Sequence, residues 1–109
     1  MSSTQEAGFA AATDWASGSW TVTEGNEAEF VARWQEFLQW TKAEAAGFRS
    51  ASLIHDQGKP SHFISVAQWE SAEDVQAWRL LPGFATHFRA CRELCEDLYA
   101  ADYVLEVQV

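Results

Sequence analysis

Residues 48–70, FRSASLIHDQGKPSHFISVAQWE, decide the fold of this chain. They contain two stretches of alternating side chains, 48–56 and 61–70, on either side of turn residues at 57–60. This pattern predicts a β-hairpin, because glycine and proline between two alternating runs favour a tight reversal of the chain.

The register of this hairpin predicts which side chains share a face of the sheet. Because side chains alternate along a strand, cross-strand partners point to the same side. A turn centred between Gly58 and Lys59 pairs Ile54 with Phe63, Ser52 with Ser65, Ser50 with Ala67 and Phe48 with Trp69. This face has small, hydroxyl-bearing residues in its middle, and the other face carries Ala51, Leu53, Ile64 and Val66. Both faces of the sheet are therefore expected to be apolar.

The remaining segments predict one βαββαβ unit, an α+β fold with an antiparallel sheet. Asn26 with Glu29 three residues on, and Ser71 with Asp74, are capping signals for two helices. Pro82 ends the second helix and suits the first turn of a third. The predicted elements are a strand at 18–24, a helix at 27–45, the hairpin, helices at 72–80 and 84–98, and a strand at 102–109.

Helices joined by right-handed crossovers cover only one face of such a short sheet. The other apolar face then needs a partner, and a second copy of the chain in a closed symmetric dimer is the simplest one. We therefore expect a homodimer. Residues 1–14 are small and polar without periodicity, which predicts a flexible N-terminal extension before a single domain at 15–109.

Composition excludes several classes of partner. Seven basic against sixteen acidic residues give a net charge of −9, which repels nucleic acid and anionic membrane surfaces. No apolar run reaches the ~20 residues of a membrane span, and the N-terminus does not resemble a secretory signal, so we expect a cytoplasmic protein. Cys91 and Cys95 are four residues apart in a predicted helix, a spacing that indicates free, buried thiols.

Aromatic residues are more numerous than one small core requires. The chain has 6 Trp, and Phe, Trp and Tyr together make 14% of it. Flat, rigid rings in this number indicate a pocket for a planar aromatic ligand between the helices and the serine-bearing face. The alternative is that rings such as Phe37 and Phe88 fill this space as ordinary core. The residues predicted to line the pocket are Phe30, Trp34, Phe48, Ser50, Ser52, Phe63, Ser65, Trp69, Trp78 and Phe88.

The order of elements, with Trp69-Glu70-Ser71 after the hairpin and Pro82-x-Phe84 before the last helix, resembles the antibiotic biosynthesis monooxygenase family over residues 18–109. The run 67–71, AQWES, is similar to the cofactor-independent monooxygenases of aromatic polyketide pathways. The resemblance implies ferredoxin-like protomers that form a dimeric α+β barrel. It also implies oxidation of an anthrone-type phenol by molecular oxygen, with no cofactor and no metal.

In those enzymes four positions belong to the substrate site. The resemblance places a Trp at Trp69 and an Arg at Arg89, which this sequence keeps. It places an Asn at Ser65 and a Tyr at Val75, where this sequence departs from the pattern. A hydroxyl is then the hydrogen-bonding group that remains at Ser65.

Oxygen is a triplet and reacts slowly with a phenol or anthrone until the organic molecule loses a proton. His87 lies on an apolar helical stripe and is our predicted proton acceptor, with Ser65 binding a substrate oxygen. Trp69 and Trp78 are expected to stack on the substrate and to offer an indole N–H, and Arg89 completes the predicted catalytic set. The alternative for His87 is a core histidine bonded to a backbone carbonyl.

Two other functions stay open. One is a non-catalytic dimer that binds a ligand in the same pocket. The other, implied by a haem-degrading branch of the superfamily, is haem binding. Trp78 falls on that branch's Trp position, but Gly18 replaces its Asn and Phe88 stands at the proximal His position.

Other clusters of reactive residues are weaker. His87, Cys91 and Cys95 lack the fourth ligand of a structural zinc site, so no metal is predicted there. His55 and His62 lie beside Asp56 at the hairpin mouth, where we expect them to face water or the dimer partner. The sequence contains no Ser-His-Asp motif and no nucleotide-binding fingerprint.

Overall fold

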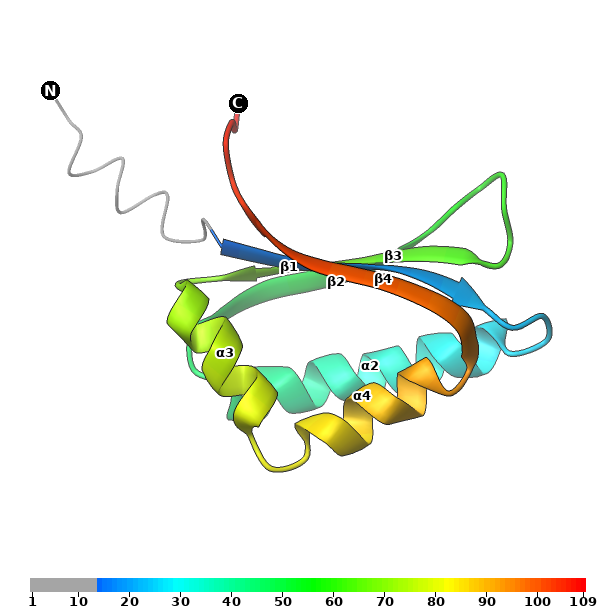
Figure 1. The fold of residues 1–109 in the computed structure, drawn as a ribbon, viewed down its shortest axis with the longest axis horizontal. Helices are drawn as coiled ribbons and strands as arrows, with labels where there is room; N and C mark the ends of the chain where they lie inside the picture. The colour runs from blue at the N-terminus through cyan, green and yellow to red at the C-terminus, as the bar shows by residue number, and fades with distance from the viewer. Residues whose placement is uncertain (1–13) are drawn as a thin grey trace, which may run out of the picture.

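The computed structural model describes residues 14–109, and Figure 1 shows a sheet with all of the described helices on one of its faces. The sheet is antiparallel, with strand order β2-β3-β1-β4. This arrangement confirms the predicted ferredoxin-like βαββαβ fold. The elements in chain order are β1 (Asp14–Val22), α2 (Glu27–Glu44), β2 (Phe48–His55), β3 (His62–Trp69), α3 (Ala72–Leu80), α4 (Phe84–Arg92) and β4 (Cys95–Val104).

The largest errors of prediction are at the first strand and the last. β1 begins at Asp14 rather than residue 18, and the other residues of the predicted extension, 1–13, lie outside the described part of the chain. The last helix ends at Arg92, and β4 ends at Val104 where a strand had been predicted to 109. Periodicity predicted helix at these residues because Cys95 and Leu98 continue the helical spacing of α4. Pairing with β1 places them in β4 instead.

The hairpin forms as predicted, but the predicted register differs from the observed one by one residue over most of the hairpin. Phe48 pairs with Trp69 as expected, whereas Ser52 pairs with Val66 and Leu53 with Ser65. The register shifts between Phe48 and Ser50, where an extra residue in β2 reverses the side-chain alternation. Ser50 and Ser52 therefore point to the face opposite Ser65, and both are exposed.

One of the two predicted caps is present. The hydroxyl of Ser71 accepts a hydrogen bond from the backbone N–H of Asp74 at 3.1 Å and thus caps α3. The Asn26 cap is wrong, because its side chain makes no capping bond and its amide lies 3.4 Å from the carbonyl oxygen of Leu94. Asn26 thus contacts the α4–β4 connection instead of the helix that follows it.

The core between sheet and helices consists largely of aromatic rings in contact. Trp20 lies edge-on to Trp34, with ring centroids 5.6 Å apart, and Phe37 stacks on Trp78 at 5.7 Å. Trp69 is fully buried and contacts Trp78 at 4.9 Å. Most of the ring surface of Trp20 and Trp69 is therefore buried against other core side chains.

Cys91 and Cys95 are free and buried, as predicted, although Cys95 lies in β4 and not in the helix. Burial raises the pKa of Cys91 to about 12 and that of Cys95 to about 11. Both thiols are therefore protonated at neutral pH and serve as small apolar groups. Within residues 14–109, no helix has the length and apolar character needed to cross a membrane.

Candidate functional site

A cavity of about 430 Å³ lies between the sheet and the three helices. We call it the aromatic cavity, because six rings from β1, α2, α3 and α4 line it. Its other walls are small residues of β1, β3 and β4, which leave the space that the larger rings surround. The rings are Trp20, Trp34, Phe37, Trp78, Phe84 and Phe88.

Ser65 supplies a buried hydroxyl to the aromatic cavity. It is 7% exposed, and its Oγ accepts a hydrogen bond from the indole Nε1–H of Trp20 at 3.0 Å. Since a hydroxyl both donates and accepts, this bond leaves the O–H of Ser65 to donate to a ligand. Trp20 therefore orients Ser65 while occupying one of its lone pairs.

Gly18 makes this hydrogen bond possible. It is the partner of Ser65 across β1 and β3 and also lines the cavity. A Cβ atom at this position would lie 2.7 Å from Trp20 Nε1 and 3.1 Å from Ser65 Oγ. Any larger residue must push the indole or the hydroxyl out of place, so glycine is needed for packing here and not for its backbone freedom.

Arg79 and Asp102 are the two charged residues among those that line the aromatic cavity. Arg79 on α3 donates from Nη1 and Nη2 to the two carboxylate oxygens of Asp102 on β4, at 2.8 and 2.5 Å. The hydrogen bond to Asp102 raises the pKa of Arg79, and the same bond lowers the pKa of Asp102. The side chains are 34% and 46% exposed, so the pair lies at the solvent-facing edge of the cavity.

Trp78 forms a wall of the aromatic cavity, but its polar group is already bound. Its Nε1–H donates to the hydroxyl of Thr41 at 3.0 Å, and both groups are buried. The ring face remains for stacking, whereas the predicted use of this N–H as a donor to substrate would require breaking the bond to Thr41.

Trp69, His87 and Arg89 are not among the residues that line the aromatic cavity. Trp69 lies behind Trp78, and Arg89 is exposed on α4. His87 packs against Trp40 and Phe37, with ring centroids 5.0 and 6.1 Å away. The reason is helical geometry, because Phe84 and Phe88 are four residues apart on the face of α4 that meets the cavity.

Several of the other predicted pocket residues line a separate surface groove. It has a volume of about 690 Å³, lies between α2 and the edge strand β2, and is flanked by exposed polar side chains such as Gln35 and Lys42. Trp34 lines both spaces. The predicted residues in this groove are Phe48, Ser50 and Phe63, while Phe30 and Ser52 line neither space. Most of the residues predicted to line a single pocket are therefore divided between the aromatic cavity and this groove.

Comparison with known proteins identifies the family. A sequence profile of the antibiotic biosynthesis monooxygenase family matches residues 16–93. The chain belongs to this family. Curated protein sequences give no match.

Solved structures show the same fold. A variant of SnoaB, a cofactor-independent oxygenase from Streptomyces nogalater, has a TM-score of 0.83 at 20% identity, over 90% of this chain and 97% of that one. A conserved protein from Methanosarcina mazei Go1 has a TM-score of 0.78 at 12% identity, over 90% and 98% of the two chains. At these identities the similarity establishes the architecture, and the activity must be argued from this family member's own residues.

Sequence reasoning missed five of the ring-bearing or charged residues that line the aromatic cavity. Phe37 was read only as a core residue, although Phe84 and Phe88 at helical spacing pointed to the right face of α4. Asp102 was the first residue of the predicted last strand, and nothing in the sequence indicated that it would pair with a residue of α3. The missed residues are Trp20, Phe37, Arg79, Phe84 and Asp102.

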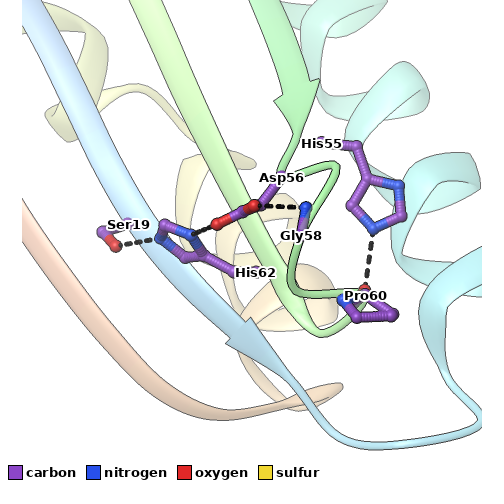
Figure 2. A network of polar contacts seen from close by, with 6 residues as sticks. All are labelled: Ser19, His55, Asp56, Gly58, Pro60 and His62. Atoms are coloured by element: carbon purple, nitrogen blue, oxygen red, sulfur yellow. Dashed lines mark hydrogen bonds and ion pairs between the residues drawn. The ribbon is translucent and has the colours of Figure 1, made fainter.

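A second polar cluster lies on the opposite face of the sheet and is drawn in Figure 2. His62 Nδ1 is 3.0 Å from a carboxylate oxygen of Asp56, and its Nε2 is 2.8 Å from the hydroxyl of Ser19. Folding thus brings Ser19, His62 and Asp56 into one series of hydrogen bonds, which no sequence motif predicted. The arrangement favours the tautomer with the proton on Nδ1, so Ser19 donates to Nε2.

This chain of hydrogen bonds holds the β2–β3 loop against β1. Asp56 also accepts from the backbone N–H of Gly58 at 2.8 Å, and the bonds from His62 and Gly58 lower its pKa. Neither Ser19 nor His62 lines the aromatic cavity or the groove. We assign the cluster to the structure of the loop.

Proposed function

We propose that the aromatic cavity is the active site of a cofactor-independent monooxygenase that oxidises a planar phenol or anthrone with O₂. The observation that carries this proposal is the buried Ser65 hydroxyl, oriented by Trp20, inside a cavity walled by six rings. Family membership supports oxygenase chemistry in general, and the similarity to SnoaB, a cofactor-independent oxygenase, supports chemistry without a cofactor.

The residues suit the steps that such a reaction needs. Stacked rings hold a flat substrate and exclude water, which strengthens every electrostatic interaction inside the cavity. The O–H of Ser65 donates to the substrate oxygen and stabilises the anion formed when the substrate loses its proton. The anion passes an electron to O₂, and the two radicals join. The proton released to solvent returns to the resulting peroxide anion, and the hydroperoxide then loses water, so that one anthrone and one O₂ give one quinone and one H₂O.

Oxygen consumption tests this proposal. Purified protein is mixed with anthrone in the presence of EDTA, and O₂ uptake is followed beside quinone absorbance. We expect uptake that EDTA leaves unchanged and that falls about 100- to 1,000-fold in Ser65→Ala, the range for loss of one preorganised donor. The exposed Ser52→Ala variant is the matched control and should keep the wild-type rate. Quinone formation no faster than in buffer would refute the proposal.

One observation favours the alternative of a non-catalytic binding dimer. Asp102, the carboxylate in the cavity lining, is occupied by Arg79, and His87 lies outside the lining. A protein that binds anthrone tightly, shifts its absorbance and consumes no O₂ would establish this second function. Haem binding has no such support, because Phe88, at the proximal position, faces the cavity with a ring that has no ligating atom.

We further propose a homodimer formed through the sheet face that the helices leave uncovered. Cross-strand pairing puts Ile54 and Tyr99 on this face, where they are 55% and 67% exposed. Exposed apolar side chains on one flat face are typical of a protein interface. Analytical ultracentrifugation at micromolar concentration should give twice the mass of one chain. The Ile54→Glu variant should give the mass of a single chain. We also propose a cytoplasmic location, which the two free thiols support.

A further inference from the structure

We propose that the guanidinium of Arg79 binds the ionised oxygen of a phenolic ligand at the edge of the aromatic cavity, with Asp102 holding it in place. This inference rests on the proposed function, because it adds a cation to Ser65 among the groups that stabilise the substrate's negative charge. It gives the cavity a cationic subsite that neither the family match nor the sequence patterns assign.

Arg79 has donors to spare after it binds Asp102. A guanidinium carries five N–H groups in a planar fork, and the two oxygens of Asp102 take one from Nη1 and one from Nη2. The side chain lines the cavity and is about one-third exposed, so it is not enclosed by protein. A ligand oxygen can therefore approach the guanidinium without displacing the carboxylate.

The guanidinium is also held in a defined position. Two parallel charge-assisted hydrogen bonds fix its plane, and they join α3 to the separate strand β4. Its Cζ lies 5.9 Å from the centre of the Trp78 ring, which itself is anchored by Thr41. A cation fixed beside an aromatic wall loses little conformational entropy when a flat anion stacks there.

The position of Arg79 differs from that of Arg89, the arginine that the family resemblance singled out. Arg89 is exposed on α4 and is not among the cavity residues, whereas Arg79 on α3 is. In this chain the cation of the cavity therefore comes from a different helix than the resemblance implied.

The test uses alizarin, a planar hydroxyanthraquinone that changes colour when its phenol ionises and that is not consumed. The dye is bound to the intact protein, and its pKa is measured from absorbance across pH. An adjacent cation lowers the pKa of an acid by about 1–3 units, and the negative charge of Asp102 opposes part of this effect, so we expect the bound dye to ionise about one unit below the free dye. That shift corresponds to about tenfold tighter binding of the ionised form.

Variants assign the shift to Arg79. Arg79→Gln should abolish it, and Arg79→Lys, which keeps the charge but loses the fork, should retain part of it. Arg33→Gln is the matched control, because Arg33 is 35% exposed and bound to Glu36 at 3.1 Å but does not line the cavity. This control should keep the full shift.

Two results would overturn the inference. One is a bound dye whose pKa in the wild-type protein is not lowered, a measurement that needs no variant to fold. The other is an unchanged shift in folded Arg79→Gln. Because the titration involves no turnover, its failure beside normal O₂ uptake would remove the subsite and leave the oxygenase. A pKa shift that is lost in Arg79→Gln, in a protein whose wild type shows no O₂ uptake, would leave the subsite and remove the oxygenase.

Discussion

Replacing Gly18 by Ala tests whether the Trp20–Ser65 pair is as tightly packed as the structure indicates. The new Cβ would lie 2.7 Å from Trp20 Nε1, and Trp20 is 2% exposed, so the indole can retreat only toward the aromatic cavity that it lines. Overpacking of this kind costs about 1–3 kcal/mol. Separating the indole from Ser65 adds about 1–3 kcal/mol for a buried N–H without a partner.

One effect opposes this loss. Gly18 does not have a positive φ, so alanine is compatible with the backbone there and stabilises the fold by about 0.4–1 kcal/mol through the unfolded state. Because the indole can relieve the clash by giving up its hydrogen bond, the two costs are alternatives in part. We therefore expect a net loss of about 1–4 kcal/mol in the free energy of unfolding.

Urea denaturation followed by tryptophan fluorescence measures this loss. The matched control is Gly58→Ala, whose Cβ would meet only Asp56 Oδ1 at 3.6 Å, an ordinary contact. This control should change stability by less than about 1 kcal/mol. A Gly18→Ala protein as stable as the wild type would refute the packing argument.

Other predictions concern single groups of the described structure. The hydrogen bond from His62 lowers the pKa of Asp56 below 3.8, so its stabilising effect is full above that pH and is lost as the pH falls through the folded-state pKa. The stability gap between wild type and Asp56→Asn, measured in urea, should therefore close on acidification, and a gap that is constant with pH would contradict this. Cys91, with a pKa of about 12, should resist iodoacetamide at pH 8 until denaturant is added. Thr41→Val leaves the Trp78 indole N–H unpaired and should cost about 1–3 kcal/mol by thermal denaturation, and an unchanged melting temperature would show that the bond contributes nothing.

The hairpin shows how far local patterns extend. Alternation and turn chemistry were enough to locate β2, β3 and the turn between them, because these signals are contained in consecutive residues. They were not enough for the register of Ser52, since one extra residue near Arg49 reverses the facing of the strand and leaves no mark on composition. The same limit placed Cys95 in a helix, where pairing with β1 decided otherwise.

The candidate site divides in the same way. Its aromatic character and the hydroxyl of Ser65 follow from the sequence, because residue types on one strand face are fixed by alternation. The Trp20–Ser65 bond joins residues 45 positions apart, and the Arg79–Asp102 pair joins residues 23 apart. Such contacts depend on which strands become neighbours and on how a helix is rotated about its axis. Those choices are made by the packing of the whole core and not by any local segment. The sequence by itself thus determined the βαββαβ order and the kind of cavity, and only the tertiary structure decided which charges meet in it.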